Sequence, residues 1–151
     1  MPPAWMLPPD AIRRRVNLAF GSDQYVRLAE AWNRATVNLP QRVVERIIPS
    51  SQYAAWPRKG THGPVSSTTL HLLGLARDAG WSSLTRSERE LVANALRAQG
   101  MVVENLAGGE WRPGQRLQKH LHFGVSRAEV VARGLRPLLE ELGRKAARRG
   151  R

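Results

Sequence analysis

The chain has 151 residues and no cysteine, and its 24 Lys and Arg against 12 Asp and Glu give a formal net charge of +12. This length suffices for one sizeable hydrophobic core, and the absence of cysteine excludes disulfides, thiolate catalysis and zinc sites built on thiolates. No apolar stretch approaches the roughly 20 residues that cross a bilayer, so we expect no membrane span, no secretory leader and a cytoplasmic location.

The positive charge is the strongest indication of a partner. The last eight residues contain five Lys and Arg and no acid, and the rest of the chain is also basic. Such an excess attracts phosphates at long range with little dependence on base sequence. We therefore expect a nucleic acid as the partner, DNA rather than RNA. The competing explanation is that 21 Arg against 3 Lys reflects a GC-rich genome and that the charge keeps the protein soluble.

The first part of the chain is predicted to be an extended arm followed by three short helices. Four prolines between Pro2 and Pro9 disfavour a helix and predict the arm over residues 1–9. Apolar residues at helical spacing follow, with Asp10 and Ser22 as expected N-caps. The predicted helices cover residues 10–20, 22–39 and 40–48.

The remaining boundaries follow from composition. Residues 49–66 are rich in Pro, Gly and Ser, which predicts a surface loop. We expect a single globular domain over residues 10–143, made of a helical part (10–48), that loop and a helix-hairpin-helix part (67–143). The basic tail, 144–151, is expected to fray.

Two further helices are predicted between residues 66 and 100. One starts at Ser66 or Ser67, is apolar nearly all round and ends at Gly80, so we expect it to be central. The second covers 86–99 behind a capping box of Thr85 and Glu88. Its expected packed face consists of Leu91, Val92, Ala95 and Leu96, and its expected basic face of Arg86, Arg89, Ala93 and Arg97.

A β-hairpin and further helix are predicted after Gly100. Residues 101–106 and 115–123 have strand-like patterns separated by turn-forming residues. A second capping box, Ser126 and Glu129, precedes an amphipathic stretch that forms either one helix kinked near Pro137 or two short ones. The sequence therefore predicts a mainly α fold with a small β-hairpin.

One boundary suggests a known family. Leu96, Gly100 and the apolar residues 101–103 match the boundary between helix and strand in winged-helix domains, and residues 67–123 resemble the second half of such a DNA-binding domain. The turn over 80–85 is longer than in the standard motif. The resemblance implies that helix 86–99 enters the major groove and that the hairpin acts as a wing. The predicted nucleic-acid-binding residues are Arg86, Arg89, Asn94 and Arg97 on the helix, Arg112, Arg116 and Lys119 on the wing, and Arg144, Lys145, Arg148, Arg149 and Arg151 in the tail.

Catalytic and metal sites are not predicted. His120 and His122 would share one side of a strand, but no Asp, Glu or Cys lies nearby in sequence, and His62 and His71 could join them only through the fold. No nucleophile motif and no glycine-rich phosphate loop is present. We therefore expect no enzymatic activity, no cofactor and no metal.

Three function classes remain open. The first is a small DNA-binding regulator or architectural factor, typical of phages and mobile elements. The second is a structural or assembly protein of a virion or ribonucleoprotein particle, and the third is an adaptor or inhibitor that binds an acidic protein surface. We expect a homo-oligomer or a subunit of a larger assembly, located in the cytoplasm or, for the second class, in a virion.

Overall fold

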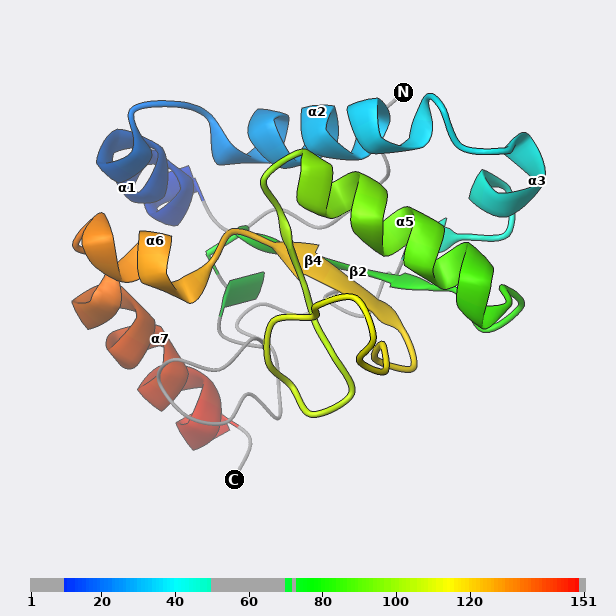
Figure 1. Cartoon of the computed structure of the whole chain (residues 1–151). Helices are drawn as coiled ribbons and strands as arrows, with labels where there is room; N and C mark the ends of the chain where they lie inside the picture. The colour runs from blue at the N-terminus through cyan, green and yellow to red at the C-terminus, as the bar shows by residue number, and fades with distance from the viewer. Residues whose placement is uncertain (1–9, 50–69, 72, 150–151) are drawn as a thin grey trace.

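The structure of the protein, a computed structural model, describes residues 10–49, 70, 71 and 73–149, which form helices packed around one small sheet. The predicted arm and nearly all of the predicted loop 49–66 lie outside these residues. The elements in chain order are α1 (Asp10–Phe20), α2 (Gln24–Thr36), α3 (Gln41–Val44), β1 (Ile48–Pro49), β2 (Ala76–Gly80), α5 (Arg86–Ala98), β3 (Val102–Val103), β4 (Leu121–Gly124), α6 (Arg127–Ala132) and α7 (Arg136–Arg149) (Figure 1).

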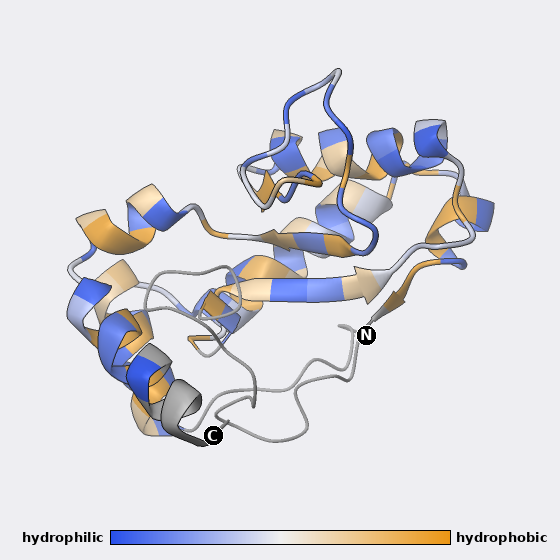
Figure 2. Ribbon diagram, turned by 90° about the horizontal axis from the view of Figure 1, so that it is seen from below, coloured by the Kyte–Doolittle hydropathy of each residue, from blue (hydrophilic) through white to orange (hydrophobic). Residues whose placement is uncertain are grey.

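The sheet is antiparallel, with the strand order β1-β2-β4-β3. The two central strands pair so that Arg77 lies opposite Phe123 and Asp78 lies opposite His122. Because successive side chains of a strand point to opposite faces, Leu121 and Phe123 share one face and His122 points to the other. In Figure 2 the central strands change between hydrophobic and hydrophilic colours along their length.

Two hydrophobic clusters hold the fold together. The first joins α2, α5 and one face of the sheet, where Trp32 stacks on Phe123 with ring centroids 5.6 Å apart. The second joins α1, α6 and α7 to the segment around Leu75. The helices α2 and α5 lie together on one side of the sheet, whereas α1, α6 and α7 group at one end of it (Figure 1). The face of the sheet opposite α2 and α5 contains the buried polar side chains of Asp78 and His122.

The three N-terminal helices are confirmed, with two differences in their ends. The N-cap of α2 is Asp23 and not Ser22, because the Asp23 carboxylate accepts hydrogen bonds from the backbone N–H groups of Tyr25 and Val26. The third helix is only four residues long, and Ile48 belongs to β1 and is exposed. Sheet pairing with Gly80 takes the place of the last helical turn.

The predicted helix from Ser66 or Ser67 to Gly80 is wrong over its second half. Leu70 and His71 are helical, but residues 76–80 form β2 at the centre of the sheet. A short run that is buried on all sides has no periodicity that separates helix from strand, so local sequence alone could not decide between them. This error concealed a strand whose Arg77 and Asp78 are buried.

Helix α5 is confirmed together with its capping box, in which Thr85 accepts from the Glu88 N–H and Glu88 accepts from the Thr85 N–H. Its faces are rotated relative to the prediction. Leu91, assigned to the packed face, is 49 % exposed, whereas Ala93, assigned to the basic face, is fully buried. The helix therefore packs along Val92, Ala93 and Leu96.

The hairpin of β3 and β4 is confirmed, and the C-terminal segment forms two helices. Gly134, with φ of 75°, ends α6 in a backbone conformation that favours glycine, which decides between the two alternatives. Helix α7 extends to Arg149 and so includes most of the predicted basic tail.

The mainly helical fold with a small antiparallel sheet agrees with the sequence, whereas a winged-helix fold is not confirmed. A helix, a strand, a loop and a returning strand occur in the expected order over residues 86–124. The element before them, however, is β2 and not the expected helix. Within the described parts of the chain, none of the helices is both long and apolar enough to cross a membrane.

Candidate functional site

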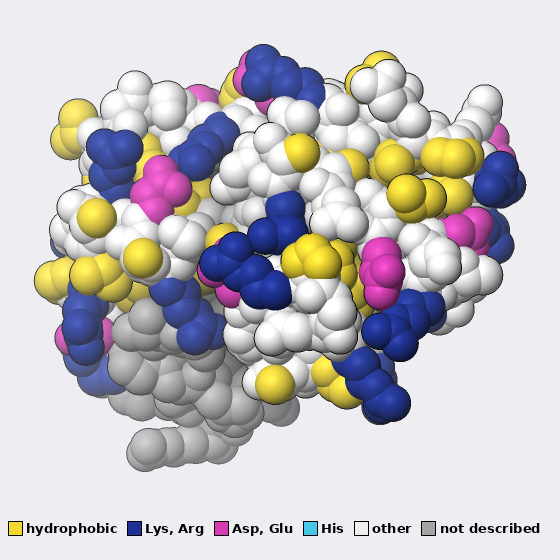
Figure 3. Space-filling model, viewed as in Figure 1, with side chains coloured by type: hydrophobic (Ala, Val, Ile, Leu, Met, Phe, Trp, Pro, Cys, Tyr) yellow, Lys and Arg dark blue, Asp and Glu magenta, His cyan; other side chains and the backbone are white. Residues whose placement is uncertain are grey.

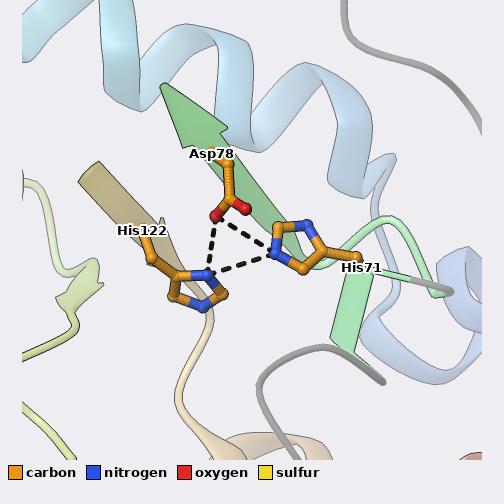
Figure 4. A group of neighbouring side chains, drawn as sticks. All are labelled: His71, Asp78 and His122. Carbon is orange, nitrogen blue, oxygen red and sulfur yellow. Dashed lines mark hydrogen bonds and ion pairs between the residues drawn. The ribbon is translucent and has the colours of Figure 1, made fainter. Parts of the chain in front are cut away.

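Three polar side chains meet on the face of the sheet opposite α2 and α5. His71 Nε2 lies 3.1 Å from His122 Nδ1 and 3.2 Å from Asp78 Oδ1, and His122 Nδ1 lies 2.8 Å from the same carboxylate oxygen. The three side chains, called the His-Asp-His cluster below, are only 4, 5 and 10 % exposed for His71, Asp78 and His122. Figure 4 shows the three groups pointing toward one another.

The fold explains how distant residues form this cluster. Asp78 on β2 and His122 on β4 are cross-strand neighbours in the antiparallel register, so their side chains project on the same face. His71 comes from the helical turn ahead of β2, and its imidazole Nδ1 lies 3.1 Å from the carbonyl oxygen of Ala76. The rings of His71 and His122 meet edge to face, with centroids 4.8 Å apart.

Burial sets the charge of the cluster. Burial lowers the pKa of His71 to about 4, although the hydrogen bond to Asp78 and its negative charge act to raise that pKa. This imidazole is therefore neutral at pH 7. Burial alone would raise the pKa of Asp78, but hydrogen bonding to His122 and then to His71 outweighs it and holds that pKa well below its usual range. The cluster therefore contains an ionised carboxylate beside a neutral imidazole.

Further polar groups surround the cluster. Glu104 Oε2 lies 3.6 Å from His122 Nδ1, and His120 Nε2 lies 3.7 Å from the second oxygen of Asp78. His122 and Glu104 also line a cavity of about 220 Å³, together with Ser126, Arg127 and loop residues 108–110. The described residues that could hold a metal ion are His71, Asp78 and His122. The cluster thus lies beside a cavity large enough for several water molecules or a small ligand.

On α5, three of the predicted nucleic-acid-binding residues have side-chain contacts within the protein. Arg89 lies over the Trp81 ring, with Cζ 5.8 Å from the centroid, and donates to the carbonyl oxygens of Trp81 and Ser82. Arg97 lies over the Trp111 ring at the same distance. Arg86 is exposed and pairs with Glu90 at 3.1 Å. Asn94 is exposed.

The predicted wing residues Arg112, Arg116 and Lys119 are all exposed on the loop over residues 104–120. Two buried tryptophans hold the loop backbone: Trp111 Nε1 donates to the Gln115 carbonyl oxygen at 3.0 Å, and Trp81 Nε1 donates to that of Gln118 at 3.2 Å. The basic side chains of this loop therefore extend from a fixed backbone.

The positive charge does not collect in one patch on the face seen in Figure 3. Lys and Arg side chains are spread over that face, and several have acidic side chains beside them. Ion pairs account for part of this, such as Arg27 with Glu129 at 3.0 Å and Arg46 with Glu88 at 2.6 Å. In the predicted tail, Arg144 is exposed and the backbone through Arg149 is helical, while Arg151 and the side chains of Lys145, Arg148 and Arg149 lie outside the described residues.

Sequence reasoning noted both His120 and His122 but missed the cluster. The missing partner was Asp78, which lies in a segment predicted to be helical, so its register with His122 was not foreseen. An Arg-Asp pair in an otherwise apolar run, residues 75–79, was the available signal, because a charged residue buried in a strand needs a partner.

Comparison of the chain with protein-family models, curated proteins and solved structures gave no significant match, so the site rests on its own geometry.

Proposed function

We propose that this protein binds the phosphate backbone of a nucleic acid through the basic side chains of loop 104–120. The observation that supports this most directly is the exposure of Arg112, Arg116 and Lys119 on a loop whose backbone two tryptophans hold in place. A fixed backbone reduces the conformational entropy lost on binding. The net charge of +12 adds a long-range attraction to phosphates.

The loop also borders the cavity beside the His-Asp-His cluster. Glu110 and Arg127 line that cavity, and Arg127 is exposed at the start of α6. Among the described residues, Arg112 is the one of the three loop cations that pairs with an acid, Glu110, at 3.4 Å, and that pair is exposed. Exposed pairs of this kind contribute roughly 0–1 kcal/mol, so a phosphate competes readily for the guanidinium.

A winged-helix mode of binding is the more specific form of this proposal. It requires α5 to read bases through Arg86, Arg89, Asn94 and Arg97. The tryptophan contacts of Arg89 and Arg97 favour a smaller role for the helix than for the loop, because moving either guanidinium onto a base would forfeit those contacts. We therefore propose sequence-independent binding with the loop as its main contact.

Fluorescence anisotropy of labelled duplex DNA and single-stranded RNA, measured with chelator over a salt series, tests the proposal. We expect affinity to fall linearly with salt on logarithmic axes, as counterions are released. Replacing Arg112, Arg116 and Lys119 together by Gln should weaken binding roughly tenfold or more and reduce the slope by up to about three. Tighter binding of the duplex would support DNA as the partner.

A matched control removes the same charge elsewhere. Arg14 and Arg15 on α1 and Arg34 on α2 are exposed, and replacing these three by Gln lowers the net charge equally. We expect a clearly smaller loss than for the loop variant. Equal losses would contradict a localised contact, and no binding of either probe at low salt would contradict nucleic-acid binding altogether.

Light scattering of the same samples tests the expected homo-oligomer.

A further inference from the structure

The His-Asp-His cluster has more lone pairs than protons between its facing atoms. A carbonyl oxygen only accepts hydrogen bonds, so the 3.1 Å contact with the Ala76 carbonyl places the His71 proton on Nδ1. His71 Nε2 then presents a lone pair toward His122 and Asp78. The carboxylate oxygen of Asp78 presents lone pairs as well.

With a neutral His71, the three short contacts between these atoms share at most one proton, that of His122 Nδ1. If His122 donates to Asp78 at 2.8 Å, the 3.2 Å contact between His71 Nε2 and Asp78 Oδ1 brings two acceptors together. If it donates to His71 at 3.1 Å, the same two acceptors still face each other. A cation placed between the three atoms would make all three contacts favourable.

We propose that His71, Asp78 and His122 bind one divalent transition-metal ion through Nε2, Oδ1 and Nδ1. Two imidazole nitrogens and one carboxylate oxygen suit zinc, iron, cobalt and nickel, whereas calcium and magnesium prefer oxygen ligands alone. This inference rests on the cluster and is independent of nucleic-acid binding.

The spacing of the three atoms fits such an ion. Bonds of about 2.1 Å separate neighbouring ligand atoms by about 3.0 Å in an octahedron and about 3.4 Å in a tetrahedron. The observed separations of 2.8, 3.1 and 3.2 Å match one triangular face of an octahedron. A metal ion centred above that triangle would reach all three atoms without any rearrangement of the strands.

The surroundings are those of a metal site with open positions. In most metal-binding histidines, the ring nitrogen that does not bind the metal donates a hydrogen bond that orients the ring. The contact of His71 Nδ1 with the Ala76 carbonyl is a hydrogen bond of this kind. His120 lies near the second oxygen of Asp78 and can play the same part for the carboxylate. Glu104, 3.6 Å from His122 Nδ1, lines the adjoining cavity and is within reach as a further ligand. Water in the cavity would fill the remaining positions.

Calorimetric titration of the untagged full chain, freed of metal by chelator, with Zn²⁺ tests the proposal. We expect one ion bound per chain. Asp78→Asn and His71→Ala should each weaken binding by more than about 100-fold, since each removes a ligand atom and loss of an outer partner alone costs 10–100-fold. Asp23→Asn is the matched control, because it removes an equal charge at the α2 N-cap, where Asn caps as well as Asp. Its Zn²⁺ affinity should be unchanged.

Two further measurements keep the test decisive if a ligand variant fails to fold. Addition of Co²⁺ to the wild-type chain should give weak visible absorption, as expected for five or six ligands, and Zn²⁺ should abolish it by competition. His120→Asn should retain one bound ion with an affinity at most about 10–100-fold lower, because His120 is an outer partner of the carboxylate and not a ligand. Absence of Zn²⁺ binding by the wild-type chain, or undiminished binding by folded Asp78→Asn, would overturn the site, and loss of binding in His120→Asn would overturn the assigned ligands.

Discussion

Gly124 shows how a missing side chain fixes the distance between the two strands that hold the His-Asp-His cluster. A Cβ at this position would clash with the carbonyl oxygen of Leu75 and lie 2.8 Å from the Cα of Ala76. Both neighbours are backbone, so β2 and β4 would have to separate. We expect Gly124→Ala to destabilise the fold by about 2–3 kcal/mol, as overpacking does elsewhere, measured by urea unfolding.

A second glycine of the same sheet provides the comparison. The nearest atom to a Cβ added at Gly80 is the carbonyl oxygen of Ile48, 3.8 Å away, which is an ordinary contact. We therefore expect Gly80→Ala to be neutral or slightly stabilising, because alanine loses less backbone entropy on folding. Similar midpoints for the two variants would contradict the close approach at Gly124.

At the scale of elements, two arginines of α5 that the sequence predicts to bind nucleic acid pack instead on neighbouring tryptophan rings. Arg89 and Arg97 lie over Trp81 and Trp111, the two rings whose N–H groups hold loop 104–120. We expect Arg97→Ala to reduce the free energy of unfolding by roughly 0.5–1 kcal/mol, the value of one cation–π contact, while changing the affinity for duplex DNA less than twofold. Urea unfolding and anisotropy measure the two effects.

Arg86→Ala is the appropriate comparison for this helix. Its guanidinium is exposed and, within the described residues, pairs with Glu90 alone, so we expect almost no change in stability. A large loss of DNA affinity in Arg97→Ala, together with full stability, would favour the winged-helix mode in which α5 reads the groove.

The elements also show which parts of the fold the sequence could predict. Helix α5 has a capping box and a clear apolar stripe within one segment, and α1 has an apolar stripe that ends before Gly21, whose φ is 74°, so both are visible without tertiary information. Strand β2 has neither. Residues 76–79 are buried, although their side chains alternate between the two faces of the sheet, and the strands that pair with β2 come from segments about 30 and 45 residues away. Long-range pairing therefore decided the fate of a segment that local sequence assigned wrongly.

The candidate site was missed for the same reason. The spacing of His120 and His122 is readable in the sequence, but the acid nearest to His122 in space, Asp78, is 44 positions away. Pairing of β2 with β4 is what makes them neighbours. The loop cations were easier to predict, because exposure of Arg112, Arg116 and Lys119 follows from the turn-forming residues around them.

At the scale of the whole molecule, buried His71 makes stability depend on pH. Its pKa is lowered from 6.5 to about 4 in the folded chain, so the unfolded chain binds a proton first as the pH falls. The stabilisation is complete above about pH 6.5 and is lost between that pH and 4. Asp78, whose pKa is also lowered, adds a further loss below about pH 4. Both groups therefore act in the same direction.

Urea unfolding with chelator at pH 7.0, 5.5 and 4.5 measures this dependence. We expect the midpoint to fall steadily over that range, and we expect the fall to be smaller in a folded His71→Gln variant, which has no titrating group at this position. A midpoint that stays constant from pH 7.0 to 4.5 in the wild-type chain would contradict the buried neutral imidazole.

The His-Asp-His cluster unites segments that are far apart along the chain, since His71 and His122 are 51 positions from each other. In an unfolded chain these donors are dispersed, so an ion held between them would have affinity for the native state alone. Mass action would then stabilise that state by about 2.7 kcal/mol at an ion concentration 100 times the dissociation constant. The concentration of free ion in the surroundings would therefore set the fraction of the protein that is folded.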